Sequence, residues 1–132
     1  MYLKNFITNL NKKYYKVSFS GVAFDSKKVK RNYIFFAIKG NKFDGNKYIP
    51  EAIKKGAKVI ISEKNIKLTN KNIVLIKNKN PRKLLAEISY KLIEKIPNNI
   101  IAVTGTNGKS SVADFYYQIL YLNRKKVASI GT

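Results

Sequence analysis

Apolar residues recur along the chain in alternating helical and strand-like patterns, which predicts an α/β fold. In Tyr2 to Lys13 the apolar positions follow the helical period and predict a short amphipathic helix. Val17 to Phe24 and Asn32 to Ile38 are typical of strands, and Ile34 to Ile38 in the second is continuously apolar, as in a buried strand. A helix is expected over Tyr48 to Lys55, because Gly56 stands where a glycine can end it.

The same alternation continues toward a boundary near residue 97. Val- and Ile-rich segments predict strands at Lys58 to Ser62 and at Asn72 to Ile76. Pro81 suits the first turn of a helix, whose apolar face ends near Ile96. The turn-forming segment Pro97-Asn98-Asn99 then interrupts the pattern. Residues 1–96 are therefore expected to form a small N-terminal α/β domain, and residues 97–132 the start of a second domain.

The second segment has the order strand, glycine turn, helix, strand. Ile100 to Val103 is an apolar run, and Lys126 to Ile130 is a second one. Between them, apolar residues recur at helical spacing from Val112 to Leu120. This order predicts the opening βαβ unit of a P-loop mononucleotide-binding domain. One such unit cannot cover its own sheet, so we expect the chain to be the front part of a longer protein.

The glycine turn has the composition of a phosphate-binding loop. Gly105 and Gly108 can adopt positive φ, Lys109 can reach the β and γ phosphates, and the Ser110 hydroxyl can ligate Mg²⁺. The first glycine of the general G-x-x-x-x-G-K-[ST] pattern would fall at Val103 and is missing. A plain glycine turn with a solvated lysine is the alternative, but the flanking patterns favour nucleotide binding. The residues expected to bind ATP are Gly105, Thr106, Asn107, Gly108, Lys109, Ser110 and Ser111.

Composition narrows the class of protein. A formal charge of +20 suggests nucleic-acid binding, but only three of the 27 basic residues are arginine and the lysines are dispersed from Lys4 to Lys126. The chain lacks cysteine and histidine, so its chemistry would depend on carboxylates, lysine, hydroxyls or water. It also lacks a signal-peptide core and an apolar stretch of membrane-spanning length. We expect a cytoplasmic protein without nucleic-acid partner or membrane insertion.

Two polar loops follow the first two predicted strands. Asp25-Ser26 could simply cap a turn, or the Ser26 hydroxyl could meet a polar ligand beyond the strand end. Gly40 to Gly45 could be a surface loop, or its glycines could let the backbone approach a ligand near Lys42. Taken singly, Asp25-Ser26 favours the simple turn cap, and Gly40 to Gly45 is only a weak indication of a ligand site.

Together, however, these motifs resemble the Mur ligase family. The N-terminal domain of that family is similar to the ordered set Asp25-Ser26-Lys27 with Val29, Ile34 to Gly40, Phe43-Asp44-Gly45, Tyr48-Ile49, Ala52-Ile53 and Gly56-Ala57. Val103 to Ser111 resembles the family's ATP loop, in which the displaced glycine is usual. Lys27 departs from the family's usual arginine, and Ser110-Ser111 replaces the more usual pair of threonines.

The resemblance implies an ATP-dependent ligase of peptidoglycan precursor synthesis. Phosphate transfer to the D-Glu carboxylate of UDP-MurNAc-L-Ala-D-Glu would give an acyl phosphate, which the amine of meso-diaminopimelate or L-lysine attacks. ATP and Mg²⁺ are the implied cofactors, with Lys109 as the catalytic residue and Ser110 as a metal ligand. The residues implied to bind UDP-MurNAc, in a small uridine-nucleotide-binding domain, are Phe24, Ser26, Asn41, Lys42 and Phe43.

Several alternatives remain. Ser129 to Thr132 resembles the family member that adds the third peptide residue, and the member that adds D-Ala-D-Ala to UDP-MurNAc-tripeptide is the nearest alternative. A relative of folate-polyglutamate synthetase or a nucleotide kinase would share the phosphate loop but would not need the uridine-binding domain. We expect a monomer that has no ligase turnover by itself.

Overall fold

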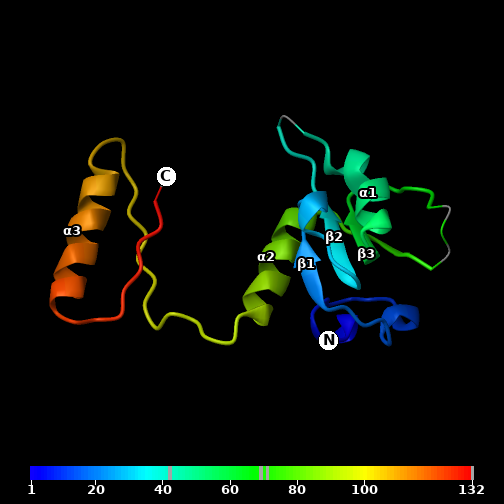
Figure 1. Cartoon of the computed structure of the whole chain (residues 1–132), viewed down its shortest axis with the longest axis horizontal. Coiled ribbons are helices and arrows are strands. Elements are labelled where there is room, and N and C mark those ends of the chain that lie inside the picture. Colours follow the sequence, from blue (N-terminus) through cyan, green and yellow to red (C-terminus); the bar gives the residue numbers. More distant parts are fainter. Residues whose placement is uncertain (42, 69, 71, 132) are drawn as a thin grey trace. The chain divides into compact units, whose positions relative to one another are not determined.

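The computed structural model describes residues 1–41, 43–68, 70 and 72–131. They fall into two compact units, Met1–Glu94 and Lys95–Thr132. Each unit is described separately, and Figure 1 shows the elements of both. No helix in the described part is long and apolar enough to cross a bilayer.

A parallel sheet of four strands forms the centre of the first unit. Its strands are β1 (Gly21–Ala23), β2 (Tyr33–Ala37), β3 (Ala57–Ser62) and β4 (Val74–Lys77), and they lie side by side in sequence order. β2 and β3 are almost entirely buried, which agrees with their continuously apolar sequences. The four predicted strands are thus present, although β1 forms only the last part of the segment predicted from Val17.

Two helices cover opposite faces of this sheet, as Figure 1 shows. Alternate strand residues point to opposite faces, so Phe36 and Ile61 pack in one core and Phe35 and Ile60 in the other. Helix α2 (Pro81–Leu92) belongs to the first core and helix α1 (Ile49–Lys54) to the second. The result is a three-layer α/β unit, and the predicted α/β class is confirmed.

The predicted N-terminal helix is wrong. Residues 2–13 instead contain the short 3₁₀ helix Leu3–Asn5, and a second one, Lys12–Tyr14, begins at their end. Asn9 has a φ of 56°, a left-handed conformation that an α-helix does not tolerate. The apolar pattern was nevertheless informative about burial, because Leu3, Ile7 and Leu10 all pack in the core beside α2.

The helix ends follow local signals. Gly56 ends α1 with a φ of 101°, and a Cβ there would lie 2.9 Å from Cα of Arg31. This position therefore requires glycine both for its conformation and for its close contact. Asn80 caps α2 by accepting a hydrogen bond from the Lys83 amide at 3.0 Å. That helix ends at Leu92, about one turn before the predicted position.

In the second unit only the helix is formed. Helix α3 (Lys109–Leu122) agrees with the predicted pattern. The predicted strands at Ile100 to Val103 and Lys126 to Ile130 are wrong, because neither segment is part of a hydrogen-bonded ladder. A strand needs a paired neighbour, and among the described residues no other strand pairs with these segments. No described residue of this unit is buried, so α3 carries its apolar face without a core.

Candidate functional site

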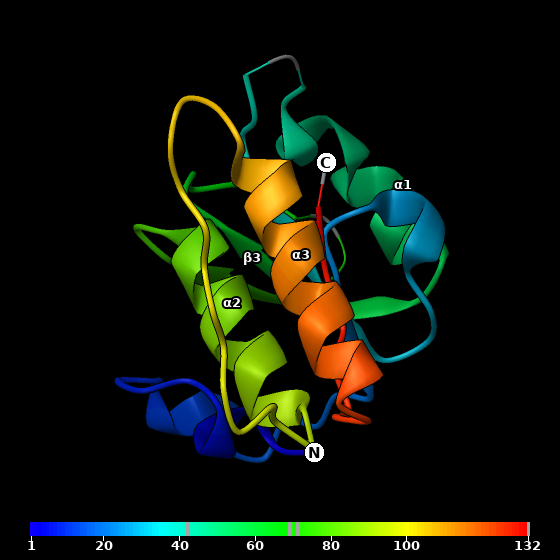
Figure 2. The same cartoon turned by 90° about the vertical axis from the view of Figure 1, so that its left-hand side faces the viewer.

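The glycine turn of the second unit leads directly into the N-terminus of α3. Figure 2 shows the chain curling over into the first turn of this helix. Gly105 has a φ of 152° and Gly108, the N-cap residue, has a φ of 74°. Nothing lies within 4 Å of a Cβ built at Gly108, so its backbone conformation, not crowding, calls for glycine there.

The amides of the first helical turn are available to a ligand. Gly108 offers no side-chain cap, and the first helical hydrogen bond in this part of the chain runs from the Val112 amide to the Gly108 carbonyl at 2.9 Å. The amides of Lys109, Ser110 and Ser111 therefore lack helical acceptors, as at every helix start. Since the helix dipole adds positive potential here, the turn can accept an anion such as phosphate.

Lys109 lies over the same turn. Its Nζ donates hydrogen bonds to the carbonyls of Gly105 and Thr106 at 2.6 and 3.1 Å. These contacts hold the ammonium group of Lys109 against the backbone of the glycine turn. Residues 104–111 are all exposed, so a ligand in solution can reach them. The structure thus brings together the seven residues predicted to bind ATP, although their individual roles remain predictions.

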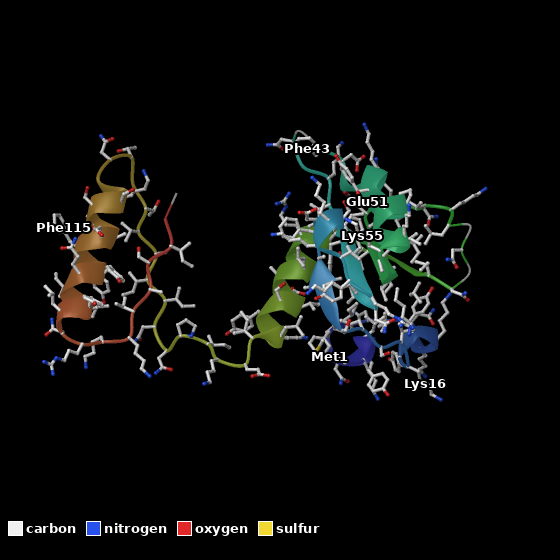
Figure 3. All side chains as sticks on the ribbon, in the orientation of Figure 1. Met1, Lys16, Phe43, Glu51, Lys55 and Phe115 are labelled. Carbon is white, nitrogen blue, oxygen red and sulfur yellow. The ribbon has the colours of Figure 1, made fainter. Side chains whose placement is uncertain are left out.

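Phe24, Ser26, Asn41 and Phe43, four of the residues predicted to bind UDP-MurNAc, lie beyond the carboxyl ends of β1 and β2. Phe24 and Phe43 are 65 % and 70 % exposed, which is unusual for phenylalanine and leaves both rings free to stack on a ligand. Figure 3 shows Phe43 at the opposite end of the first unit from Met1 and Lys16. Asn41 is exposed on the same loop, and Lys42 lies outside the described residues.

Ser26 differs from these exposed residues. It is 5 % exposed, and its Oγ donates a hydrogen bond to Glu51 at 2.8 Å. Glu51 also pairs with Lys55 at 2.9 Å, and both side chains are labelled in Figure 3. The bond from Lys55, followed by the bond from Ser26, lowers the pKa of Glu51. Ser26 therefore ties the loop after β1 to α1, and a ligand would reach only its oxygen lone pairs.

A polar network fixes the loop after β2. Asp44 accepts hydrogen bonds from the Asn46 amide at 3.0 Å and pairs with Lys64 at 2.9 Å. The Lys64 ammonium group, with the amide and side chain of Asn46, holds the pKa of Asp44 well below its usual value. Buried Ser62 closes the ring by donating to Asn46 Oδ1 at 2.7 Å and accepting from the Lys64 amide at 3.0 Å.

This network of Asp44, Asn46, Ser62 and Lys64 was not among the predicted site residues. Only the Asp44-Gly45 pair carried a signal, since Asp-Gly is typical of turns. Gly45 is required by packing, because a Cβ there would lie 2.6 Å from the Ile38 carbonyl oxygen. The pairing of Asp44 with Lys64 joins residues 20 positions apart and depends on the parallel pairing of β2 with β3.

Comparison with known proteins shows to which family these strands and loops belong. A family model described as the catalytic domain of the Mur ligase family matches residues 18–99, more than half of the chain. The chain belongs to the Mur ligase family. The match includes β1 to β4 and both polar loops, and it ends before the glycine turn at Gly105. The family resemblance expected from the motifs is therefore confirmed.

Among the curated relatives within the Mur ligase family are several diaminopimelate-adding ligases. The UDP-N-acetylmuramoyl-L-alanyl-D-glutamate–2,6-diaminopimelate ligase of Rickettsia typhi is 38 % identical over 128 residues, which cover 94 % of this chain and 25 % of that protein. The ligase of the same name from Clostridioides difficile is 40 % identical over 118 residues, or 88 % of this chain and 24 % of that protein. The chain spans about a quarter of the length of these Mur ligases.

Solved Mur ligase structures share the fold. A UDP-N-acetylmuramoyl-L-alanyl-D-glutamate–2,6-diaminopimelate ligase matches with a TM-score of 0.72 at 23 % identity, over 95 % of this chain and 26 % of that one. The MurF ligase of Thermotoga maritima, solved with ADP, matches with a TM-score of 0.58 at 29 % identity, over 76 % of this chain and 23 % of that one.

Proposed function

We propose that this chain carries the uridine-nucleotide and phosphate-loop parts of a ligase that adds a diamino acid to UDP-MurNAc-L-Ala-D-Glu. The main support is one combination of features. A Mur ligase segment related to diaminopimelate-adding enzymes is followed by a glycine turn that opens a helix. A nucleotide kinase would need only the turn. Residues 1–96 would form the domain that binds UDP-MurNAc, and residues 97–132 the start of the ATP-binding domain.

The chemistry explains why a phosphate loop is needed. A carboxylate is a poor electrophile at neutral pH, so the D-Glu carboxylate must be activated before an amine can form an amide. ATP supplies a phosphoryl group, an acyl phosphate forms, and the amine displaces phosphate. In this chain the free amides of the α3 start would bind phosphate oxygens, and Lys109 would neutralise charge that develops on the γ-phosphate.

A magnesium ion would fit beside Ser110 at the start of α3. Ser110 offers a hydroxyl oxygen in the first turn of α3, and Mg²⁺ prefers oxygen ligands. In the part of the chain that the structure describes, no group of three His, Cys, Asp or Glu side chains could hold a metal ion. Ser110 would therefore contribute one ligand, and phosphate oxygens and water would provide others. The bound ion would stabilise negative charge on the phosphates.

The loops after β1 and β2 would bind the uridine nucleotide and hold it in position. The exposed rings of Phe24 and Phe43 can pack against the uracil base, and Asn41 can hydrogen-bond to it. Ser26 can offer its oxygen while it stays bonded to Glu51. Lys42 would add a charge near the nucleotide. We propose that the protein acts as a monomer in the cytoplasm.

Titration of the 132-residue chain with ATP and Mg²⁺ tests the loop. Lys109→Ala should weaken ATP binding roughly tenfold or more, because it removes a charge-assisted bond worth about 1.5–3 kcal/mol. Lys125→Ala removes an equal charge from the exposed segment after α3 and should leave the affinity unchanged. Equal ATP affinity in wild type and Lys109→Ala would contradict the role of the loop.

A second titration tests the substrate. UDP-MurNAc-L-Ala-D-Glu should bind the chain, and Phe43→Ala should weaken that binding. Phe115→Ala removes a similarly exposed ring from α3 and should not weaken it. Binding of the tripeptide substrate in preference to the dipeptide would favour the D-Ala-D-Ala-adding ligase. We also expect no tripeptide product when ATP, Mg²⁺, the dipeptide substrate and diaminopimelate are mixed with this chain alone.

A further inference from the structure

A small cavity opens beyond the carboxyl ends of β2 and β3 and beside the start of α2. Its volume is about 130 Å³. Three separate segments supply its polar lining: the loop after β2, the residues after β3, and the connection from β4 to α2. The carboxyl edge of a parallel sheet is where such folds usually bind ligands. The charged residues of the lining are Lys39, Glu63, Lys64, Lys79 and Arg82.

The charges in this cavity are strongly unbalanced. Its lining includes four cationic residues, Lys39, Lys64, Lys79 and Arg82, and only one carboxylate, that of Glu63. Lys64 already pairs with Asp44. Lys39, Lys79 and Arg82 have no carboxylate within salt-bridge distance among the residues that the structure describes. Basic residues are common in a chain of net charge +20, but here four of them line one cavity and come from three separate segments. An anion in the cavity would relieve their mutual repulsion.

Part of the wall is held rigidly. Asn46 and Lys64 belong to the network closed by Ser62, whose side chain is fully buried. The start of α2 is fixed by Asn80, whose side chain accepts from the Lys83 amide and whose own amide donates to Asn78 at 2.8 Å. Because Asn80 caps the helix itself, the positive potential of the cavity comes chiefly from the basic side chains. A preformed wall lowers the ordering cost of binding a small ligand.

The size of the cavity limits the ligand. A water molecule occupies about 30 Å³ in the liquid, so the cavity holds the equivalent of roughly four waters. That space suits one or two phosphoryl groups but not a base and sugar as well. A carboxylate would fill less of the space and would offer fewer oxygens to Arg82 and the lysines.

We propose that this cavity binds a phosphoryl anion through Arg82, Lys79 and Lys39. The anion has two possible sources: the diphosphate of the nucleotide substrate, in which case the inference rests on the proposed function, or a free phosphate or pyrophosphate. Both sources use the same chemistry, in which guanidinium and ammonium groups donate charge-assisted hydrogen bonds to phosphate oxygens.

Calorimetric titration of the full 132-residue chain with inorganic pyrophosphate tests the site. Lys79→Gln combined with Arg82→Gln should weaken pyrophosphate binding by at least about tenfold. The matched control is Lys54→Gln combined with Lys28→Gln, which removes the same charge from exposed positions away from the cavity. If wild type does not bind pyrophosphate, the inference is wrong. If both double variants lose equal affinity, attraction to the overall charge is sufficient to explain binding, and the inference is also wrong.

The same variants distinguish the two sources. If the nucleotide diphosphate occupies the cavity, UDP binding should fall in the Lys79→Gln/Arg82→Gln protein, and uridine binding should not change. If pyrophosphate binding falls but UDP binding does not, the cavity takes a free anion and the inference still holds. If wild type binds pyrophosphate but no uridine nucleotide, the proposed function fails while the anion site remains.

Folding is checked separately. Lys79 and Arg82 are exposed, so thermal unfolding of the double variant should match wild type. Lys39→Gln changes a different segment of the lining and should also weaken pyrophosphate binding. Unchanged pyrophosphate affinity in both the Lys39→Gln and the Lys79→Gln/Arg82→Gln proteins would overturn the site.

Discussion

Gly45→Ala should destabilise the protein by an amount that can be worked out from the backbone around it. A Cβ at Gly45 would lie 2.6 Å from the carbonyl oxygen and 2.7 Å from the amide nitrogen of Ile38. Both atoms belong to the backbone after β2, so no side-chain rotation relieves the contact. Overpacking of this kind costs about 1–3 kcal/mol. The shift would also strain the Gly45 amide to Ile38 carbonyl bond, which is 3.0 Å long and contributes about 0.5–1.5 kcal/mol.

Gly40→Ala is the matched control. It lies in the same loop, and its added Cβ would meet only the Phe43 carbonyl oxygen, at 3.4 Å. Both substitutions restrict the unfolded chain equally, which by itself stabilises by about 0.4–1 kcal/mol. The difference between the two variants therefore isolates the contact with Ile38, and we expect Gly45→Ala to be less stable than Gly40→Ala by about 2–4 kcal/mol.

Urea unfolding followed by far-ultraviolet circular dichroism measures this difference. All buried side chains in the described part of the chain belong to the first unit, so the cooperative transition reports on that unit. The midpoint should fall without a change in slope, because the native and unfolded surfaces stay similar. If Gly45→Ala unfolds within about 0.5 kcal/mol of Gly40→Ala, the loop can move freely and the reasoning is refuted.

Three further predictions concern the network and the cores. Ser62→Ala removes the hydroxyl that donates to Asn46 from a fully buried position and should cost about 1–3 kcal/mol in urea unfolding; a loss below about 0.5 kcal/mol would indicate that water replaces the hydroxyl. The pKa of Asp44 is lowered in the folded state, so its contribution to stability is present above the unfolded value of about 3.8 and is lost as pH falls. Asp44→Asn should therefore lose less stability than wild type during acid titration, and identical acid transitions would contradict this. Ile88→Ala empties a fully buried position in α2 and should cost about 2–5 kcal/mol, whereas Phe115→Ala on α3 should change the unfolding transition little. Equal effects of these last two substitutions would contradict the assignment of the core to the first unit.

The fold of the first unit could be predicted largely from local pattern. The continuous apolar run of Ile34 to Ile38 indicated a strand buried on both faces, and Gly56 and Pro81 indicated where helices end and begin. The N-terminal pattern misled, because one 3₁₀ turn at Leu3 and the irregular backbone after it bury Leu3, Ile7 and Leu10 without forming an α-helix, and Asn9 turns the chain between them. Here the spacing of apolar residues predicted which side chains are buried, but it did not predict which backbone hydrogen bonds form.

The candidate sites were predictable only in part. The spacing of Gly105, Gly108 and Lys109 indicated the turn at the helix start, because local conformation determines it. The partners of Ser26 and Asp44 could not be predicted, because Glu51 and Lys64 approach them only through strand pairing and helix packing. The predicted strands flanking the turn failed for a related reason, since a ladder depends on neighbours that the apolar runs themselves cannot specify.

The sequential order of the strands has a consequence for how the protein emerges from the ribosome. Each strand pairs with the next strand along the chain, so the sheet can grow as residues are added, without a long-range strand exchange. Synthesis at about 5–20 residues per second delivers the first 94 residues within roughly 5–20 s. The first core must wait for the end of this unit, because Leu84 and Ile88 of α2 complete it. A nascent chain stalled once α2 has left the ribosome should already resist protease at the sheet.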